Sequence, residues 1–183
     1  MLIVLDVDGV LTDGKKYYDN TGKGIYKTFN DKDFTAIKQF KANGWDIVFL
    51  SGDTNVNEAV ANNRNIDFFN NRDSGGMVDK ATYIPKFETR YNVESLDMVY
   101  VGDDVFDINI MNQVGYSFCP SDSPNSVKKV AIDLEVKGGE GVIVKLFEYF
   151  LLKGMVFEPT VDVLIKWDRN EKFSYNTLRA SKL

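Results

Sequence analysis

The chain has 183 residues, of which 44% are hydrophobic and 13% aromatic, and its formal net charge is −5. This length and composition predict one soluble domain with a substantial core. The negative charge argues against binding of a nucleic-acid backbone, which normally needs clustered basic side chains. No apolar run is long enough to span a membrane, and the opening segment meets charge too early for a signal peptide, so we expect a cytoplasmic protein.

The chain contains no histidine, and Cys119 is its only cysteine. A single cysteine cannot form an internal disulfide, and the lack of histidine removes the usual zinc ligand and the usual general base. Any acid–base or metal chemistry must therefore fall to carboxylates.

Short apolar segments alternate with segments of helical period along the chain. The apolar segments are typical of buried parallel strands and cover Leu2–Leu5, Asp46–Leu50, Ile66–Phe69, Met98–Val101 and Tyr116–Cys119. Between them a helix is expected over Val78–Tyr91, which Pro85 should kink or split. The alternation predicts an α/β fold of three layers, with a Rossmann-like parallel sheet that binds ligands at the carboxyl ends of its strands.

Two stretches break this alternation. Aromatic residues in Lys15–Phe29 surround a turn-forming segment, which predicts a protruding β-hairpin that packs on another subunit. An ordinary surface hairpin is the alternative. The tail after Leu152 has no clear period. We therefore expect one domain over residues 1–152 and an extension of unknown role over residues 153–183.

Acidic side chains follow two of the predicted strands. Asp6 and Asp8 come directly after the first strand, while Asp103 and Asp104 follow the fourth, with Asp107 one helical turn further. If the two strands are neighbours, these carboxylates converge. Like charges about 4 Å apart repel by roughly 4 kcal/mol at an effective dielectric constant of about 20, so the group needs a cation or a shared proton. Oxygen ligands in this number, without histidine or cysteine, suit Mg²⁺.

The string DVDGVLT over residues 6–12 resembles the first motif of the haloacid dehalogenase phosphatases. Three further motifs follow in the family's order. They are the hydroxyl of Ser51 after the second strand, the lysine Lys80, and the acidic Gly102–Asp104 with Asp107. The resemblance covers residues 2 to 152 and leaves the tail uncovered.

The resemblance implies a phosphatase in which Asp6 attacks phosphorus and forms an aspartyl-phosphate. Asp8 would protonate the leaving oxygen and then take a proton from the attacking water. Ser51 would donate a hydrogen bond to a phosphoryl oxygen, and Lys80 would offset negative charge. The alternatives are a turn serine and a solvated lysine.

The resemblance also implies a Mg²⁺ cofactor. The Asp6 carboxylate, the Asp8 backbone carbonyl and Asp103 would hold the ion. Asp104 and Asp107 would orient Lys80 and the metal's water ligands. For these last two residues, a helix cap and a solvated helix face are the alternatives.

The hairpin after the first motif, and the lack of an insertion large enough for a lid, resemble the capless branch of the superfamily. Within it, Gly138–Gly139 before Gly141 resembles the 3-deoxy-octulosonate 8-phosphate phosphatases. This resemblance implies a fold without a cap domain and a homotetramer in which a neighbouring subunit covers each site.

Two acidic residues depart from that subfamily where it usually has arginine, Asp53 after Ser51-Gly52 and Glu140 between two glycines. Arginine suits the carboxylate of a sugar acid, and an acid repels it. Lys15, Lys32, Arg64 or Arg72 could compensate. The expected substrate is a sugar-acid phosphate or related small phosphomonoester. The alternatives are a nucleotide or neutral sugar phosphate and, in another class, a non-catalytic oligomeric module.

Overall fold

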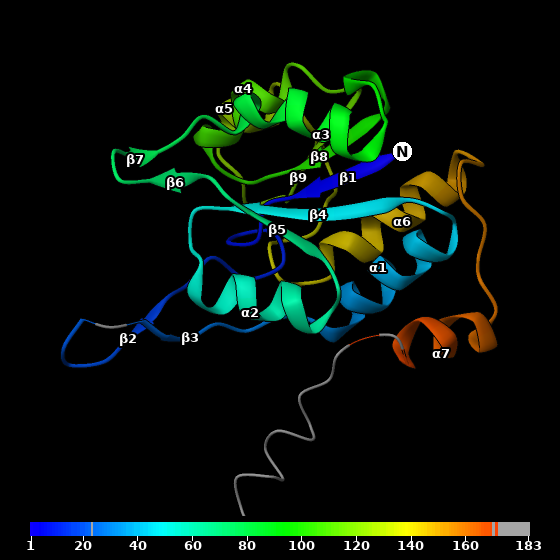
Figure 1. The fold of residues 1–183 in the computed structure, drawn as a ribbon, viewed down its shortest axis with the longest axis horizontal. Coiled ribbons are helices and arrows are strands. Elements are labelled where there is room, and N and C mark those ends of the chain that lie inside the picture. The colour runs from blue at the N-terminus through cyan, green and yellow to red at the C-terminus, as the bar shows by residue number, and fades with distance from the viewer. Residues whose placement is uncertain (23, 170, 172–183) are drawn as a thin grey trace, which may run out of the picture.

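The computed structural model describes residues 1–22, 24–169 and 171 of the chain. A six-stranded parallel sheet with the strand order β10-β9-β8-β1-β4-β5 forms its middle layer (Figure 1). The strands are β1 (Leu2–Leu5), β4 (Asp46–Ser51), β5 (Asp67–Asn70), β8 (Met98–Val101), β9 (Tyr116–Cys119) and β10 (Ile132–Asp133). The predicted three-layer α/β fold is confirmed.

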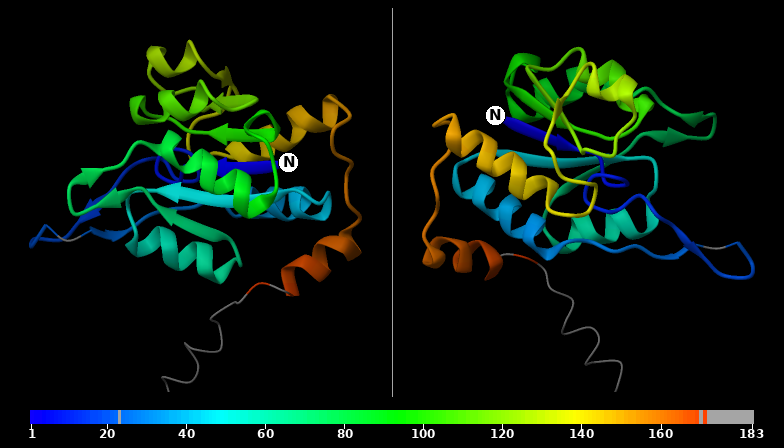
Figure 2. Two further views of the ribbon diagram at one scale, coloured as in Figure 1. Left: turned by 45° about the horizontal axis from the view of Figure 1, so that its top comes forward. Right: turned by 180° about the vertical axis from the view of Figure 1, so that it is seen from behind.

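Helices cover both faces of the sheet (Figures 1 and 2). One face carries α1 (Asp31–Ala42), α2 (Asn55–Asn63) and α6 (Val142–Leu152). The other carries α3 (Ile84–Tyr91), α4 (Ile108–Met111) and α5 (Asn125–Lys128). The described residues also form the short 3₁₀ helices η1 (Lys80–Tyr83), η2 (Ser95–Asp97) and η3 (Val105–Asp107). Among the described residues, none of the helices has the length and apolar character that crossing a membrane would demand.

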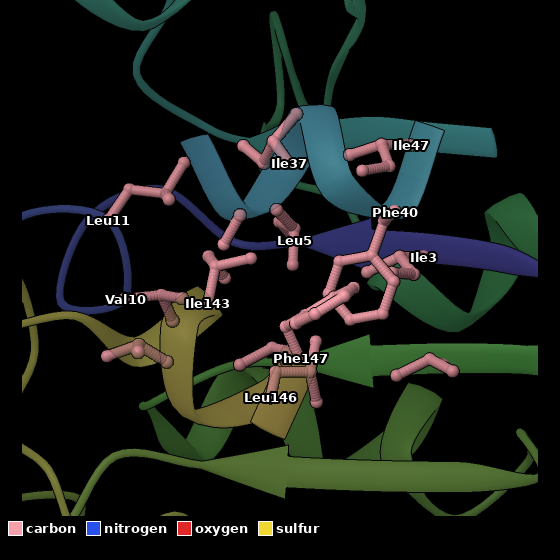
Figure 3. Packing of buried hydrophobic residues seen from close by; sticks show 14 of the residues in the cluster. Ile3, Leu5, Val10, Leu11, Ile37, Phe40, Ile47, Ile143, Leu146 and Phe147 are labelled. Atoms are coloured by element: carbon pink, nitrogen blue, oxygen red, sulfur yellow. The ribbon is translucent and has the colours of Figure 1, made fainter. Parts of the chain in front are cut away.

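The central strand β1 is buried on both faces. Ile3 and Leu5 point into the cluster formed with α1 and α6, whereas Leu2 and Val4 point into the cluster on the opposite face. Figure 3 shows the first cluster, in which Phe40 of α1 lies beside the sheet and α6. Because side chains alternate along a strand, a strand covered on both faces must be apolar throughout, as this one is.

Most elements expected from the sequence lie where the pattern placed them. The strands β1, β8 and β9 have the predicted bounds, and β5 begins one residue later than expected. Pro85 lies in the first turn of α3, directly after η1, so the expected helix is split in two. Not predicted were β10 and the hairpin of β6 (Arg72–Asp73) and β7 (Gly76–Met77), because two-residue strands carry no period.

The predicted hairpin after the first motif is present. It consists of β2 (Tyr17–Tyr18) and β3 (Gly24–Tyr26) and projects from the body of the molecule (Figures 1 and 2). The rings of Tyr17 and Tyr26 stack with their centroids 4.6 Å apart, and both remain 40% or more exposed. Stacking within the hairpin therefore covers only part of the surface of these two rings. Its packing on another subunit stays a prediction.

The chain after α6 turns back along the molecule and forms α7 (Val161–Arg169) against α1. Lys38 of α1 pairs with Asp168 at 2.6 Å, and the side chain of Asn43 exchanges two hydrogen bonds with the backbone of Phe157. The sequence pattern gave no indication of this helix. The remainder of the extension, residues 172–183, lies outside the described residues.

Candidate active site

The carboxyl ends of β1, β4 and β8 meet at one edge of the sheet, because β1 pairs with both neighbours in register. A cavity of about 500 Å³ opens there. Six of the seven residues singled out from the sequence line this cavity: Asp6, Asp8, Ser51, Lys80, Asp103 and Asp104. The seventh, Asp107, lies buried behind it. The condition for convergence, that β1 and β8 are neighbours, is met.

Lys80 joins two carboxylates beneath the cavity. Its ammonium donates to Asp6 Oδ2 and to Asp107 Oδ1, each at 2.7 Å, and the residue is only 3% exposed. Burial alone would lower the pKa of Lys80, but the charges of Asp6 and Asp107 outweigh burial and raise it above the usual value. Lys80 is therefore a fixed cation and not a solvated side chain.

Asp107 is fully buried and has all its acceptor positions occupied. Oδ1 accepts from Lys80 and from the hydroxyl of Tyr100, and Oδ2 accepts from the backbone amides of Asp103 and Asp104. A Cβ on Gly102 would lie 2.4 Å from Asp107 Oδ2, so this turn requires glycine. Asp107 thus orients Lys80 and the loop that carries Asp103. The role of Tyr100 was not predicted, because a tyrosine within an apolar strand is normally interpreted as a core residue.

Asp104 has a different role from its neighbours. Its side chain accepts from the amide of Val105 at 2.5 Å and so caps the first turn of η3. With Asp107 it forms a reciprocal capping arrangement. The alternative considered for Asp104, a helix cap, therefore describes this contact, although the residue also lines the cavity.

Oxygen atoms of Asp6, Asp103 and Asp107 lie within 4.8 Å of one another. Burial and the charge of Asp107 outweigh the ion pair with Lys80 and raise the pKa of Asp6 to about 7. Burial and the charges of Asp6 and Asp107 raise the pKa of Asp103 to about 8. Asp107 has no acceptor position left, so Asp6 and Asp103 are the two members of this cluster that can offer an oxygen to a cation, and one ammonium serves three carboxylates. Two hard oxygen donors in such a field fit a divalent cation such as Mg²⁺.

The first loop closes directly over this group. Gly9 has a φ of +85°, and a Cβ there would lie 2.0 Å from Asp103 Oδ2. Glycine is required for the backbone conformation and also for the close approach of the two loops.

The Asp8 side chain is held by partners that the sequence did not reveal. Its Oδ1 pairs with the ammonium of Lys27 at 2.6 Å, and its Oδ2 accepts from the amide of Asn57 at 3.1 Å. Both partners are buried, since Asn57 has no exposed surface and the Lys27 side chain is 5% exposed. Asp8 is thus fixed by the base of the hairpin and by α2. Its carboxylate is not part of the cluster formed by Asp6, Asp103 and Asp107.

Asp53, at the position where the resemblance implies an arginine, is neutralised in place. Its carboxylate pairs with Lys27 at 2.8 Å and Lys16 at 3.2 Å, and these bonds hold its pKa below the usual value despite partial burial. Arg72 and Lys16 line the cavity, and the guanidinium of Arg72 is anchored through Nε to the carbonyl of Gly52. Of the cations proposed to compensate, Arg72 lies at the cavity, whereas Arg64 pairs with Glu171 beside α7.

Comparison with known proteins agrees with this geometry. No family profile matches the chain. The 3-deoxy-D-manno-octulosonate 8-phosphate phosphatase KdsC of Haemophilus influenzae is 30% identical over 151 residues, covering 81% of each protein. The chain belongs to the KdsC family. The KdsC relatives are phosphatases of the haloacid dehalogenase superfamily, so this chain is a phosphatase, as the motifs indicated.

Solved structures of KdsC enzymes have the same fold as this chain. The cobalt-bound phosphatase of Haemophilus influenzae has a TM-score of 0.75 and 29% identity, with 84% of this chain and 88% of that one covered. The enzyme from Moraxella catarrhalis, in complex with a magnesium ion, a phosphate ion and a KDO molecule, has a TM-score of 0.73 at 19% identity. It covers 100% of this chain and 92% of its own. At that identity it supports the fold alone.

Proposed function

We propose that this chain is a magnesium-dependent phosphomonoesterase that works through an aspartyl-phosphate on Asp6. One observation carries the proposal. Asp6 lies at the end of the central strand, faces a cavity, and is joined there by the buried ammonium of Lys80 and the carboxylate of Asp103. A carboxylate in that position can attack a phosphoryl group, and its surroundings offset the charge that would otherwise repel the substrate.

In the first step, an Asp6 oxygen forms a bond to phosphorus while the bond from phosphorus to the ester oxygen breaks. Asp8 gives its proton to the departing oxygen, which leaves as an alcohol. In the second step, water attacks phosphorus and the bond to Asp6 breaks. Asp8 accepts the proton of that water, and inorganic phosphate is released. Lys27 and Asn57 hold Asp8 at the cavity for both proton transfers.

The remaining groups bind and orient the phosphoryl group. Ser51 donates a hydrogen bond to a phosphoryl oxygen, and Lys80 keeps Asp6 oriented while offsetting its charge. The carboxylates of Asp6 and Asp103, with the backbone carbonyl of Asp8, would hold Mg²⁺. When bound, this ion supplies positive charge beside the attacking and phosphoryl oxygens. The divalent metal in the related Haemophilus influenzae structure, which is cobalt, supports this part of the proposal.

For the substrate we propose a sugar-acid phosphate or a related small phosphomonoester, since the KdsC relatives are named for 3-deoxy-D-manno-octulosonate 8-phosphate. Arg72 places positive charge in the lining of the cavity, where a carboxylate distant from the phosphate could bind. A hydrolysis screen across sugar-acid, neutral sugar and nucleotide phosphates tests this assignment. Faster hydrolysis of nucleotides or neutral sugars would replace it.

We further propose a homotetramer in which the β2–β3 hairpins associate. The exposed tyrosines of the hairpin have little of their own subunit to cover. Light scattering should give a mass about four times the 20.8 kDa of the chain. A monomer would contradict the shared cover over the site.

The catalytic proposal is tested by phosphate release with magnesium and with chelator. We expect magnesium-dependent turnover that Asp6→Asn abolishes and Asp8→Asn slows by about 10²- to 10⁴-fold. Both variants should keep the thermal unfolding temperature of the parent within a few degrees, because they retain size and shape. Absence of magnesium-dependent turnover on every phosphomonoester would favour the non-catalytic module.

A further inference from the structure

A side chain outside all the sequence motifs connects three parts of the site. Asn57 lies in the first turn of α2 and is completely buried. Its Nδ2 donates to Asp8 Oδ2 at 3.1 Å and to Ser51 Oγ at 3.0 Å, and its Oδ1 accepts from Lys27 at 3.0 Å. The amide therefore uses both donor hydrogens and an acceptor position within the site.

The orientation of this amide is fixed by its partners. The ammonium of Lys27 can only donate, so the atom facing it must be the amide oxygen. The nitrogen then faces Asp8 and Ser51. The opposite orientation would place two oxygens together at Asp8 and two donors together at Lys27, which is unfavourable for both contacts.

The fixed amide determines what the Ser51 hydroxyl can do. Ser51 Oγ accepts from Asn57 Nδ2 at 3.0 Å and from the backbone amide of Asp53 at 3.4 Å. A hydroxyl has two acceptor positions and one hydrogen, so both acceptor positions are used and the hydrogen remains. In the part of the chain that the structure describes, that hydrogen has no protein acceptor. Ser51 lines the cavity, so the hydrogen is available to a ligand there.

We infer that Asn57 is a positioning residue that makes the Ser51 hydroxyl a committed donor to a phosphoryl oxygen and holds Asp8 beside it. The inference rests on the proposed function, because that function assigns Ser51 to the phosphoryl group. A hydroxyl whose acceptor positions are filled cannot turn to accept from water or from Lys80. The phosphoryl group, which has only acceptor oxygens facing it, is the matching partner.

A double-mutant cycle tests this arrangement. The proteins are the parent, Ser51→Ala, Asn57→Leu and the double variant, all loaded with magnesium. The readouts are kcat/KM for p-nitrophenyl phosphate and the dissociation constant of inorganic phosphate from calorimetry. We expect each single variant to weaken both quantities about tenfold or more, the usual worth of a hydrogen bond to a charged group. The double variant should bind phosphate no more weakly than the single variant with the lower phosphate affinity, because the two substitutions remove the same hydrogen bond.

Asn62→Leu is the matched control, because Asn62 is exposed on the same helix and should leave both readouts at the parent value. Asn57→Ala replaces the leucine variant if that protein does not fold. Additive losses in the phosphate dissociation constant would overturn the role of Asn57. A phosphate dissociation constant that is unchanged in Ser51→Ala would overturn it as well. A parent that binds phosphate without turnover would refute the proposed function, while the binding cycle still decides the role of Asn57.

Discussion

At the scale of single residues, the negative charges in the site outnumber the positive ones. Lys80 supplies one buried positive charge for the carboxylates of Asp6 and Asp107, and Asp103 adds another negative charge nearby. Burial and that imbalance together raise the pKa of Asp6 to about 7 and that of Asp103 to about 8. A proton on these groups or a metal ion beside them relieves the same repulsion, so the two compete.

We therefore predict that magnesium binds more tightly as pH rises from 6 to 8. Below these pKa values the ion must displace protons from Asp6 and Asp103, whereas above them both groups are already ionised. The dissociation constant should fall about tenfold per pH unit for each proton displaced and then level off. Calorimetry in buffers of different ionisation heat would measure the affinity and count the protons. A dissociation constant independent of pH would show that neither carboxylate releases a proton to the metal.

Gly9 offers a second test at this scale. In Gly9→Ala, the new methyl group would collide with Asp103, so we expect weaker magnesium binding and a loss of at least tenfold in kcat/KM. Gly44→Ala is the control, because Gly44 also has a positive φ, +77°, but has nothing within 4 Å of its Cβ position. That variant should lose only about 1 kcal/mol of stability. Equal effects of the two substitutions on magnesium affinity would mean that the approach of Gly9 to Asp103 is unimportant.

At the scale of elements, α6 is capped from another helix. Its N-cap residue is Gly141, which has no side chain, and Asp33 of α1 supplies the missing acceptor. Asp33 Oδ1 accepts from the amides of Ile143 at 2.8 Å and Val144 at 3.2 Å. The contact joins the two helices that pack on β1. It thereby supports the strand that ends in Asp6.

Asp33→Ala should lower the free energy of unfolding by about 1–2 kcal/mol, the usual cost of removing a helix cap. Asp33→Asn keeps an acceptor oxygen and should lose less. Asp31→Ala, in the same turn of α1 but exposed, is the control and should change stability by a few tenths of a kcal/mol. Urea denaturation measures all three. If Asp31→Ala lost as much stability as Asp33→Ala, the loss would come from α1 itself and not from the cap on α6.

The elements also show what sequence could and could not predict. The strand β1 and the acids after it were predictable, because an apolar run and a motif are both local in the chain. Lys27 and Asn57 were not, since each has an ordinary local context and they meet only when α2 packs beside the hairpin. The helix α7 was missed because none of its residues is buried, and its contacts with α1 include ion pairs such as that of Lys38 with Asp168.

At the scale of the whole molecule, the hairpin of β2 and β3 leaves an apolar surface outside the core. Tyr17, Tyr18 and Tyr26 are 40%, 61% and 52% exposed. The hairpin base carries Lys27, so whatever covers the tyrosines also borders the site.

The variant Tyr17→Ser with Tyr26→Ser should therefore reduce the mass measured by light scattering below that of the proposed tetramer. Turnover should fall with it, because the proposed cover over the site is lost. Leu152→Ser, which also replaces an exposed apolar side chain but lies at the end of α6, should leave the mass unaltered. A tetramer that survives the double substitution would place the subunit contacts elsewhere.

The central place of β1 also matters for how the protein is made. Leu2 pairs with Asp46 on one side and with Met98 on the other. A growing chain can pair β1 with β4 early, but β1 lacks its second neighbour until the residues of β8 have left the ribosome. Until that moment one edge of this apolar strand is open to pairing with another chain, which favours aggregation of the nascent protein.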